Sequence, residues 1–237
     1  MFKYFYKNKY NSGVTLVELM VVIVIFVIIS GVVIFNYGQF RSSSSIQNLA
    51  DDIALSIRKA QSYAIGVRGS GSIFDIGYGV HFTLNSETEF FYGSNKLFIL
   101  FADVEKNDTY DYNGKSECEE PTKKNECLEA LSITSADKIS AIILYDGENK
   151  VVLDGKDTVD IVFNRPNPEP IFCYRKDSSG GGTPIDKGKG KGKGGVTVSS
   201  SCSQTVFSHI GITISNISDS SVFKTITIWN NGQISVS

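Results

Sequence analysis

The chain has 237 residues, of which 20% are charged and 41% are hydrophobic, and its formal net charge is −2 at pH 7. This weak charge gives no global electrostatic basis for nucleic-acid binding, which usually appears as a clear excess of Lys and Arg. About 200 residues follow the N-terminal apolar run, and this length is enough for one sizeable hydrophobic core.

The first 13 residues form a basic leader. They contain Lys3, Lys7 and Lys9, no acidic residue, and they end at Gly13. Positive charge before an apolar run predicts that the N-terminus stays in the cytoplasm and that the rest of the chain is exported. A secretory signal peptide would carry its small residue after the apolar run, whereas here Gly13 precedes it.

Residues 14–35 form a continuous apolar run whose only charged residue is Glu18. A helix of this length spans a hydrocarbon core of roughly 30 Å. A carboxylate within such a span costs several kcal/mol unless it is paired, so Glu18 is predicted to be functional. The alternative is an ordinary signal anchor in which Glu18 lies at the headgroup level.

The order of a basic leader, Gly13, a hydrophobic residue, Thr, Leu, an aliphatic residue and Glu18 resembles the prepilin signal of type IV pilins and type II secretion pseudopilins. The resemblance implies cleavage between Gly13 and Val14 by a prepilin peptidase, followed by N-methylation of Val14. It also implies that Glu18 pairs with the N-terminal amine of a neighbouring subunit in a filament. Val14 stands where phenylalanine or methionine is usual. Cleavage would leave 224 residues with 20 basic and 25 acidic side chains.

Residues 36–66 are predicted to continue the helix as an amphipathic segment. Apolar residues recur there at three- and four-residue spacing, which gives a stripe that can pack on a sheet. The stripe consists of Ile46, Leu49, Ala50, Ile53, Ile57, Ala60 and Ala64. The helix is predicted to end at Gly66. The four serines at 42–45 weaken the helix locally, so a bend is possible there.

From residue 67 onward the apolar period changes from that of a helix to that of strands, which predicts a β-rich head over residues 67–237. The Asn230-Asn231-Gly232 sequence predicts the turn of a terminal hairpin. A long N-terminal helix followed by strands predicts an α+β fold, with the helix packed on an antiparallel β-sheet. The alternation of Val80, Phe82 and Leu84 with His81 and Thr83 predicts a half-buried strand. The predicted strands cover residues 80–84, 89–92, 97–102, 141–145, 158–163, 170–174, 206–214, 224–229 and 233–236.

The order of segments is also similar to that of H-type minor pseudopilins and their type IV pilus relatives. The similar segments are residues 48–64, 78–82, 100–103 and 226–235. Relative to the compact domain of that family, residues of about 112–130 and 174–205 look like insertions.

Four cysteines, Cys118, Cys127, Cys173 and Cys202, lie in the predicted exported part. An even number in such a location predicts disulfides, for which three pairings exist. We favour Cys118 with Cys127 and Cys173 with Cys202, because each pair brackets a polar, loop-like segment. Zinc ligation is the less favoured alternative, since the chain has no CxxC pair.

An acidic segment follows the strand predicted at 97–102. It contains the oxygen-bearing residues Asp103, Glu105, Asn107, Asp108 and Asp111. Asp103, Glu105, Asn107 and Asp111 are candidate calcium ligands, although Asp108 and Gly114 occupy the positions where an EF-hand loop needs glycine and a bidentate acid. The interpretation we favour is a solvated turn stabilised by Asx hydrogen bonds, with no cofactor required.

The segment at 186–195 alternates glycine with Lys187, Lys189, Lys191 and Lys193. Its composition predicts a flexible loop. The functional alternative is a basic finger that contacts DNA phosphates or another anionic partner without reading sequence. No aromatic residue is interleaved to stack on bases, which weakens the case for single-stranded DNA.

No catalytic motif is present, and the two histidines are interpreted as surface or structural residues, with His81 at an outward strand position. The prediction is therefore a non-enzymatic minor pseudopilin or pilin in the bacterial inner membrane, with a cytoplasmic N-terminus and an extracytoplasmic head. Its implied partners are other pilins or pseudopilins, the prepilin peptidase and the assembly platform. The alternatives are a DNA-binding minor pilin for DNA uptake and a membrane-anchored enzyme.

Overall fold

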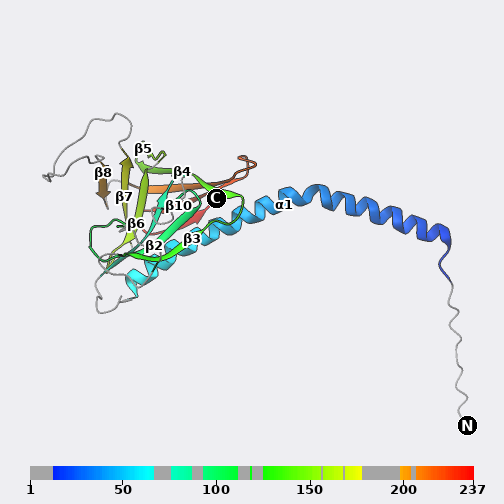
Figure 1. Ribbon diagram of the computed structural model, residues 1–237, viewed down its shortest axis with the longest axis horizontal. Helices are drawn as coiled ribbons and strands as arrows, with labels where there is room; N and C mark the ends of the chain where they lie inside the picture. The colour runs from blue at the N-terminus through cyan, green and yellow to red at the C-terminus, as the bar shows by residue number, and fades with distance from the viewer. Residues whose placement is uncertain are drawn as a thin grey trace, which may run out of the picture. The chain divides into compact units, whose positions relative to one another are not determined.

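The structure is a computed structural model that describes residues 13–66, 76–86, 93–111, 118, 125–155, 157–167, 169–177, 198–203 and 207–237. The chain divides into two compact units, residues 1–42 and residues 43–237. In Figure 1 the helix and the labelled strands can be followed in chain order by their colour.

One helix, α1 (Leu16–Ile65), contains 50 residues and belongs to both units. It continues without interruption through the four serines at 42–45. The main-chain N–H of Gly66 still donates to the Ser62 carbonyl at 2.8 Å, and the helix ends there, as predicted. The predicted apolar run and the predicted amphipathic segment therefore form a single helix.

The apolar stripe predicted for the second part of α1 is buried. All seven of its residues from Ile46 to Ala64 are at most 7% exposed, and Ile53 and Ile57 are fully buried. The charged residues Asp51, Asp52 and Arg58 are exposed on the other side of the helix. This amphipathic division confirms that the stripe fixes which side of the helix faces the core.

Eleven strands are present in the described part of the chain, and all neighbouring strands are antiparallel. A six-stranded sheet has the order β3-β2-β1-β6-β7-β8, and a five-stranded sheet has the order β11-β10-β9-β4-β5. The bounds are β1 (Gly77–Thr83), β2 (Leu97–Asp103), β3 (Cys127–Ser132), β4 (Asp137–Asp146), β5 (Asn149–Val152), β6 (Thr158–Phe163), β7 (Pro170–Asp177), β8 (Val198–Ser203), β9 (His209–Asn216), β10 (Phe223–Trp229) and β11 (Ile234–Val236).

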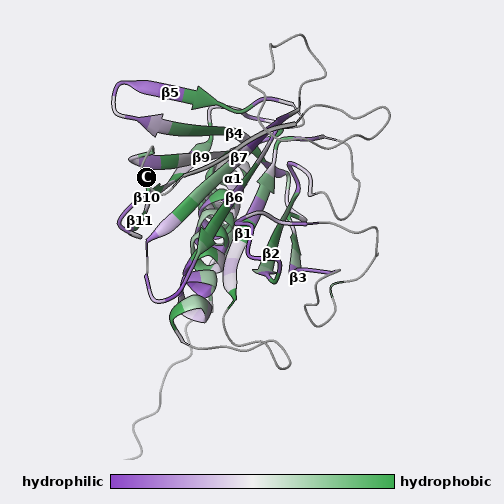
Figure 2. Cartoon of the chain, turned by 90° about the vertical axis from the view of Figure 1, so that its left-hand side faces the viewer, coloured by the Kyte–Doolittle hydropathy of each residue, from purple (hydrophilic) through white to green (hydrophobic). Residues whose placement is uncertain are grey.

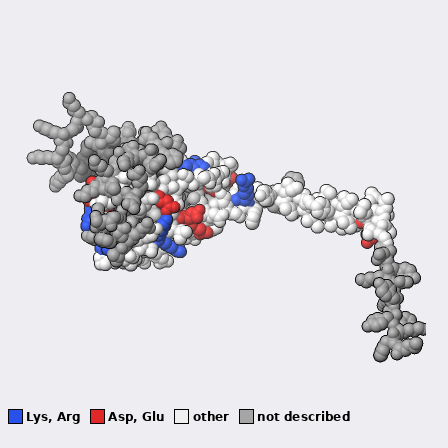
Figure 3. Space-filling model, turned by 60° about the horizontal axis from the view of Figure 1, so that its bottom comes forward, with Lys and Arg blue, Asp and Glu red and all other residues white. Residues whose placement is uncertain are grey.

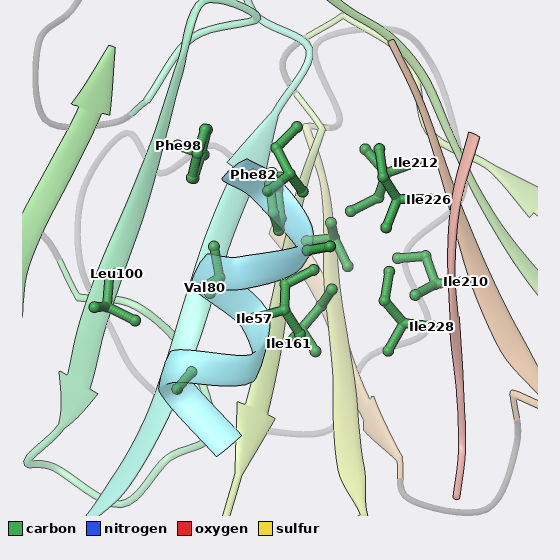
Figure 4. Packing of buried hydrophobic residues seen from close by; sticks show 14 of the residues in the cluster. Ile57, Val80, Phe82, Phe98, Leu100, Ile161, Ile210, Ile212, Ile226 and Ile228 are labelled. Atoms are coloured by element: carbon green, nitrogen blue, oxygen red, sulfur yellow. The ribbon is translucent and has the colours of Figure 1, made fainter. Parts of the chain in front are cut away.

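A single hydrophobic core joins the C-terminal half of α1 to both sheets. Figure 2 shows this part of the helix between the two sheets. In Figure 4, Ile57 of the helix lies next to Ile161 of the six-stranded sheet, while Ile210 and Ile228 approach from the five-stranded sheet. The helix packs on antiparallel sheets, so the predicted α+β class is confirmed.

A second, smaller core lies on the other face of the six-stranded sheet. It contains Ile99, Phe101, Tyr110, Cys127, Val162, Ile171 and Cys173. Because both faces of this sheet are covered, every residue of β1 and of β2 is buried. The prediction that the strand containing Val80 and Phe82 is half-buried is therefore wrong.

Glycine is required at two positions of the strands for different reasons. A Cβ atom at Gly79 of β1 would lie 2.7 Å from the Phe101 ring and 2.8 Å from the Ile161 carbonyl oxygen, so no larger residue fits. Gly232 has φ = 82° and closes the β10–β11 hairpin, whose Trp229 main-chain N–H donates to the Gln233 carbonyl. The predicted terminal hairpin is confirmed.

Strands with strong apolar alternation are found where they were predicted, and β6 has the predicted bounds. Three strands that were not predicted are β3, β5 and β8. They are sheet-edge strands of mainly polar or mixed sequence, and their pairing with a neighbour, which composition does not encode, defines them. The strand predicted at 89–92 lies outside the described residues.

Candidate functional site

The N-terminal part of α1 is the most apolar surface of the described chain. Residues Leu16–Ile34 are the one segment in the described part of the chain that is apolar and long enough to cross a membrane, with a mean hydropathy of 3.1. Its large hydrophobic side chains between residues 14 and 34 are each at least 51% exposed. Figure 3 shows this helical segment as an almost uncharged surface with a patch of acidic atoms near its start.

Thr15 and Glu18 form the first turn of this segment. The Thr15 side-chain oxygen accepts a hydrogen bond from the Glu18 main-chain N–H at 3.3 Å, which caps the helix. Glu18 is the acidic residue of that turn and lies where the positive end of the helix dipole stabilises a carboxylate. Its side chain is exposed, and no cationic partner for it is seen within the described residues.

The predicted processing residues lie next to this turn. Gly13 and Val14 are exposed and precede the first helical residue, Leu16. A Cβ atom at Gly13 would meet no atom within 4 Å, so packing within the chain does not explain the glycine. Gly13, Val14 and Glu18 are thus accessible together at the start of the helix, as a processing and assembly site requires.

The acidic segment after β2 forms a compact turn around Asp103. The Asp103 carboxylate is buried and accepts main-chain hydrogen bonds from Asn107 at 3.1 Å and from Asp108 at 2.9 Å. Burial raises the pKa of Asp103, and the two main-chain hydrogen bonds oppose this effect. These contacts are those of an Asx-stabilised turn.

Glu126 also stabilises this turn by accepting main-chain hydrogen bonds. The sequence analysis did not predict this role. One of its carboxylate oxygens accepts the main-chain N–H groups of Val104 (2.9 Å) and Glu105 (3.2 Å), and the other accepts that of Asp111 (2.9 Å). The side chain is fully buried, and burial, together with the nearby charges of Asp103 and Asp111, raises its pKa to about 7. No signal near Glu126 in the sequence indicates this role, because its partners are main-chain groups.

The calcium hypothesis for Asp103, Glu105, Asn107 and Asp111 receives no support from this geometry. The Asp103 carboxylate accepts main-chain N–H groups, and the Asn107 side-chain amide donates to the Asp111 carboxylate at 2.5 Å. Within the residues that the structure describes, no three His, Cys, Asp or Glu side chains are grouped so that they could hold a metal ion. The turn itself accounts for the side chains of Asp103, Asn107 and Asp111.

His81 is buried, so of the two interpretations, a surface residue or a structural residue, the structure supports the structural one. Its Nδ1 lies 2.6 Å from an Asp160 carboxylate oxygen, and Arg175 donates to the other oxygen of Asp160 at 3.1 Å. Arg175 also donates to the Tyr110 carbonyl at 2.7 Å, and the Tyr110 ring lies 5.0 Å from the His81 ring. His81 does face away from α1, but the turn that contains Tyr110 covers that face of the sheet.

The first predicted disulfide, between Cys118 and Cys127, is present. Cys127 begins β3 directly after Glu126, so the bond anchors the chain next to the turn that Glu126 holds. Cys173 of β7 is also disulfide-bonded and lies opposite Cys202 of β8 in the strand register. This register is the one that the second predicted pairing requires.

The four lysines proposed as DNA contacts, Lys187, Lys189, Lys191 and Lys193, lie outside the described residues. The hypothesis of DNA binding therefore rests on the sequence alone.

Comparison with known proteins supports the interpretation of the N-terminus. The family model described as the prokaryotic N-terminal methylation motif matches residues 8–34. The match supports a type IV pilin-like prepilin that is a substrate of prepilin peptidase, and it points to a structural subunit instead of an enzyme. With the apolar helix, it indicates a membrane anchor. Searches of curated proteins and of solved structures gave no match.

Proposed function

We propose that this protein is a minor pseudopilin or minor pilin that is assembled through its N-terminal helix into a type II secretion pseudopilus or a type IV pilus. The observation that carries the proposal is the methylation motif over residues 8–34, in which Gly13 is followed by an exposed apolar helix with Glu18 as its only acid. The order of one long helix followed by antiparallel sheets supports the H-type subclass.

Assembly follows from the energetics of the helix. An exposed surface of this hydropathy must be buried in a membrane or against other apolar helices. A buried Glu18 carboxylate then needs a cationic partner, because an isolated charge in hydrocarbon costs several kcal/mol. The N-terminal amine exposed by cleavage before Val14 supplies that charge when it belongs to an adjacent subunit.

In this proposal the protein is inserted with its N-terminus in the cytoplasm and its head outside the inner membrane. The prepilin peptidase cleaves after Gly13 and methylates the amine of Val14, and the assembly platform extracts the processed helix into the filament. The disulfide between Cys118 and Cys127 agrees with an oxidising location for the head.

The N-terminus of the native protein tests this proposal. Mass spectrometry of the full protein from host membranes should give an N-terminal peptide that begins at Val14 and carries one methyl group. A Gly13→Val variant should remain unprocessed, because the peptidase needs the small residue before the cut.

Gly38→Val is the matched control, since an added Cβ at Gly38, as at Gly13, meets no atom within 4 Å. The control should be processed normally. Native protein that still begins at Met1 in purified assemblies would contradict the proposed function.

A further inference from the structure

The turn after β2 contains an Asn-x-Thr sequence, Asn107-Asp108-Thr109, to which the proposed assembly assigns no role. Asn-x-Ser/Thr is the acceptor sequence for N-linked glycosylation on exported surfaces. A second copy, Asn216-Ile217-Ser218, lies at the end of β9. The two copies differ in their surroundings, so the structure can distinguish between them.

Asn107 is exposed, and its side chain is hydrogen-bonded to the third residue of the motif. Its side-chain carbonyl oxygen accepts hydrogen bonds from both the main-chain N–H and the hydroxyl of Thr109, each at 3.0 Å. The third residue of the motif therefore contacts the carboxamide directly. The amide nitrogen Nδ2 donates to the Asp111 carboxylate of the same turn at 2.5 Å, which uses one of its two N–H groups.

The main chain around Asn107 is held by hydrogen bonds to buried carboxylates, so the position of Asn107 in the turn is fixed. Asp103 accepts the Asn107 main-chain N–H, and Glu126 fixes the residues on either side of it through Glu105 and Asp111. The Asn107 side chain takes no part in the hydrophobic cores. A large group on Nδ2 of this exposed residue would therefore displace no side chain of either core.

Asn216 is unsuitable by the same criteria. It is only 6% exposed, and its Nδ2 donates to the buried Asp137 carboxylate at 2.9 Å. A sugar attached there would have to displace the buried surroundings of Asn216, including the Asp137 side chain, which also accepts from Ser45 of α1. Asn216 is therefore an internal negative control for Asn107.

We propose that Asn107 is a site of N-linked glycosylation, a modification that rests on the proposed export of the head. The donor is an oligosaccharide activated by a lipid diphosphate on the outer side of the membrane. Nδ2 attacks the anomeric carbon, the carbon–nitrogen bond forms and the bond from that carbon to the diphosphate oxygen breaks. The lipid diphosphate leaves with the electron pair of that bond, and one amide proton passes to a carboxylate of the transferase. The remaining amide N–H can still donate to Asp111.

Peptide mass spectrometry of the full protein purified from its own membranes tests the assignment. The peptide that contains Asn107 should carry a sugar mass, and the peptide that contains Asn216 should be unmodified. Asn107→Gln and Thr109→Ala should lose the modification, whereas Thr109→Ser, which keeps a hydroxyl, should retain it. The melting temperature of each variant in detergent shows that it is folded.

An unmodified Asn107 peptide in folded native protein, or equal modification of the Thr109→Ala variant, would overturn the proposal. The N-terminal peptide is read in the same sample. Protein that begins at Val14 but lacks sugar on Asn107 rejects the glycosylation site alone, whereas protein that begins at Met1 rejects the proposed function.

Discussion

At the scale of single residues, Glu126 shows how a buried carboxylate can organise a turn. Its carboxylate has no access to water and accepts three main-chain hydrogen bonds instead, from the N–H groups of Val104, Glu105 and Asp111. These hydrogen bonds favour the charged form, but burial and the neighbouring acids disfavour it more strongly, and the pKa is raised to about 7. This turn also places Tyr110 against His81, on the face of the six-stranded sheet that is opposite α1.

The raised pKa predicts how stability depends on pH. Because the ordinary pKa of Glu126 is 4.5 and the folded value is about 7, the folded protein binds more protons between these values. The stabilisation from protonated Glu126 is complete below about pH 4.5 and is lost as the pH rises through 7. The upper limit of this loss is about 3 kcal/mol, at about 1.4 kcal/mol per pKa unit.

The measurement is the melting temperature of the full protein in detergent between pH 5 and pH 8. We expect the wild type to lose stability across this range and the Glu126→Gln variant to lose less. Glu129→Gln is the matched control, since Glu129 is half-exposed and pairs with Lys59. An unchanged pH slope in Glu126→Gln would show that another group is responsible.

Glu18 gives the second prediction at this scale. Glu18→Ala should insert and be processed normally, because the change makes the helix more apolar, but its incorporation into filaments should fall at least about tenfold. That estimate follows from a lost pairing energy of several kcal/mol, since about 1.4 kcal/mol corresponds to a factor of ten.

Incorporation is measured by the fraction of the protein that sediments with sheared filaments. Val22→Ala, a change of similar size on the same exposed helix, is the control and should assemble normally. Normal incorporation of Glu18→Ala would contradict the pairing mechanism.

At the scale of elements, α1 performs two tasks with one continuous helix. Between Leu16 and Ile34 its large apolar side chains are exposed, and from Ile46 to Ala64 one side of the helix is buried against both sheets. The change from an evenly apolar surface to a stripe is visible in the sequence as the appearance of Asp, Arg and Lys on one side. This change divides the helix between the two compact units.

The packing of the stripe predicts a large effect for a single truncation. Ile57→Ala removes a fully buried side chain that lies next to Ile161 (Figure 4), and it should cost about 2–5 kcal/mol because a cavity remains. Leu55→Ala, on the same helix but 64% exposed, should cost less than about 0.5 kcal/mol. Urea unfolding of both variants in detergent measures the difference. Equal costs would show that the helix does not depend on this contact.

At the scale of the whole molecule, the head and the N-terminal segment differ in whether their apolar side chains are buried within the chain. The head buries its own apolar residues in two cores, between α1 and the sheets and beneath the turn around Tyr110. The segment Leu16–Ile34 has no such cover within the described chain. Its burial must come from a membrane or from other helices, which is the physical basis of the proposed assembly.

The sequence by itself determined the features that depend on neighbours along the chain. The methylation motif over residues 8–34, the single acid in the apolar run, the stripe of α1 and the β10–β11 turn are local patterns of spacing and charge, and reading them needs no knowledge of the fold. For the same reason the Asn107 motif could be recognised but not distinguished from that at Asn216.

Only the tertiary structure decided which side chains are buried and what they contact. The turn at Asp103 covers the second face of the six-stranded sheet, and this cover makes His81 a buried partner of Asp160. Glu126 meets residues 15 to 22 positions away through their main-chain N–H groups, which every residue but proline has. Such contacts depend on how distant segments come together, and residue type and spacing do not encode them.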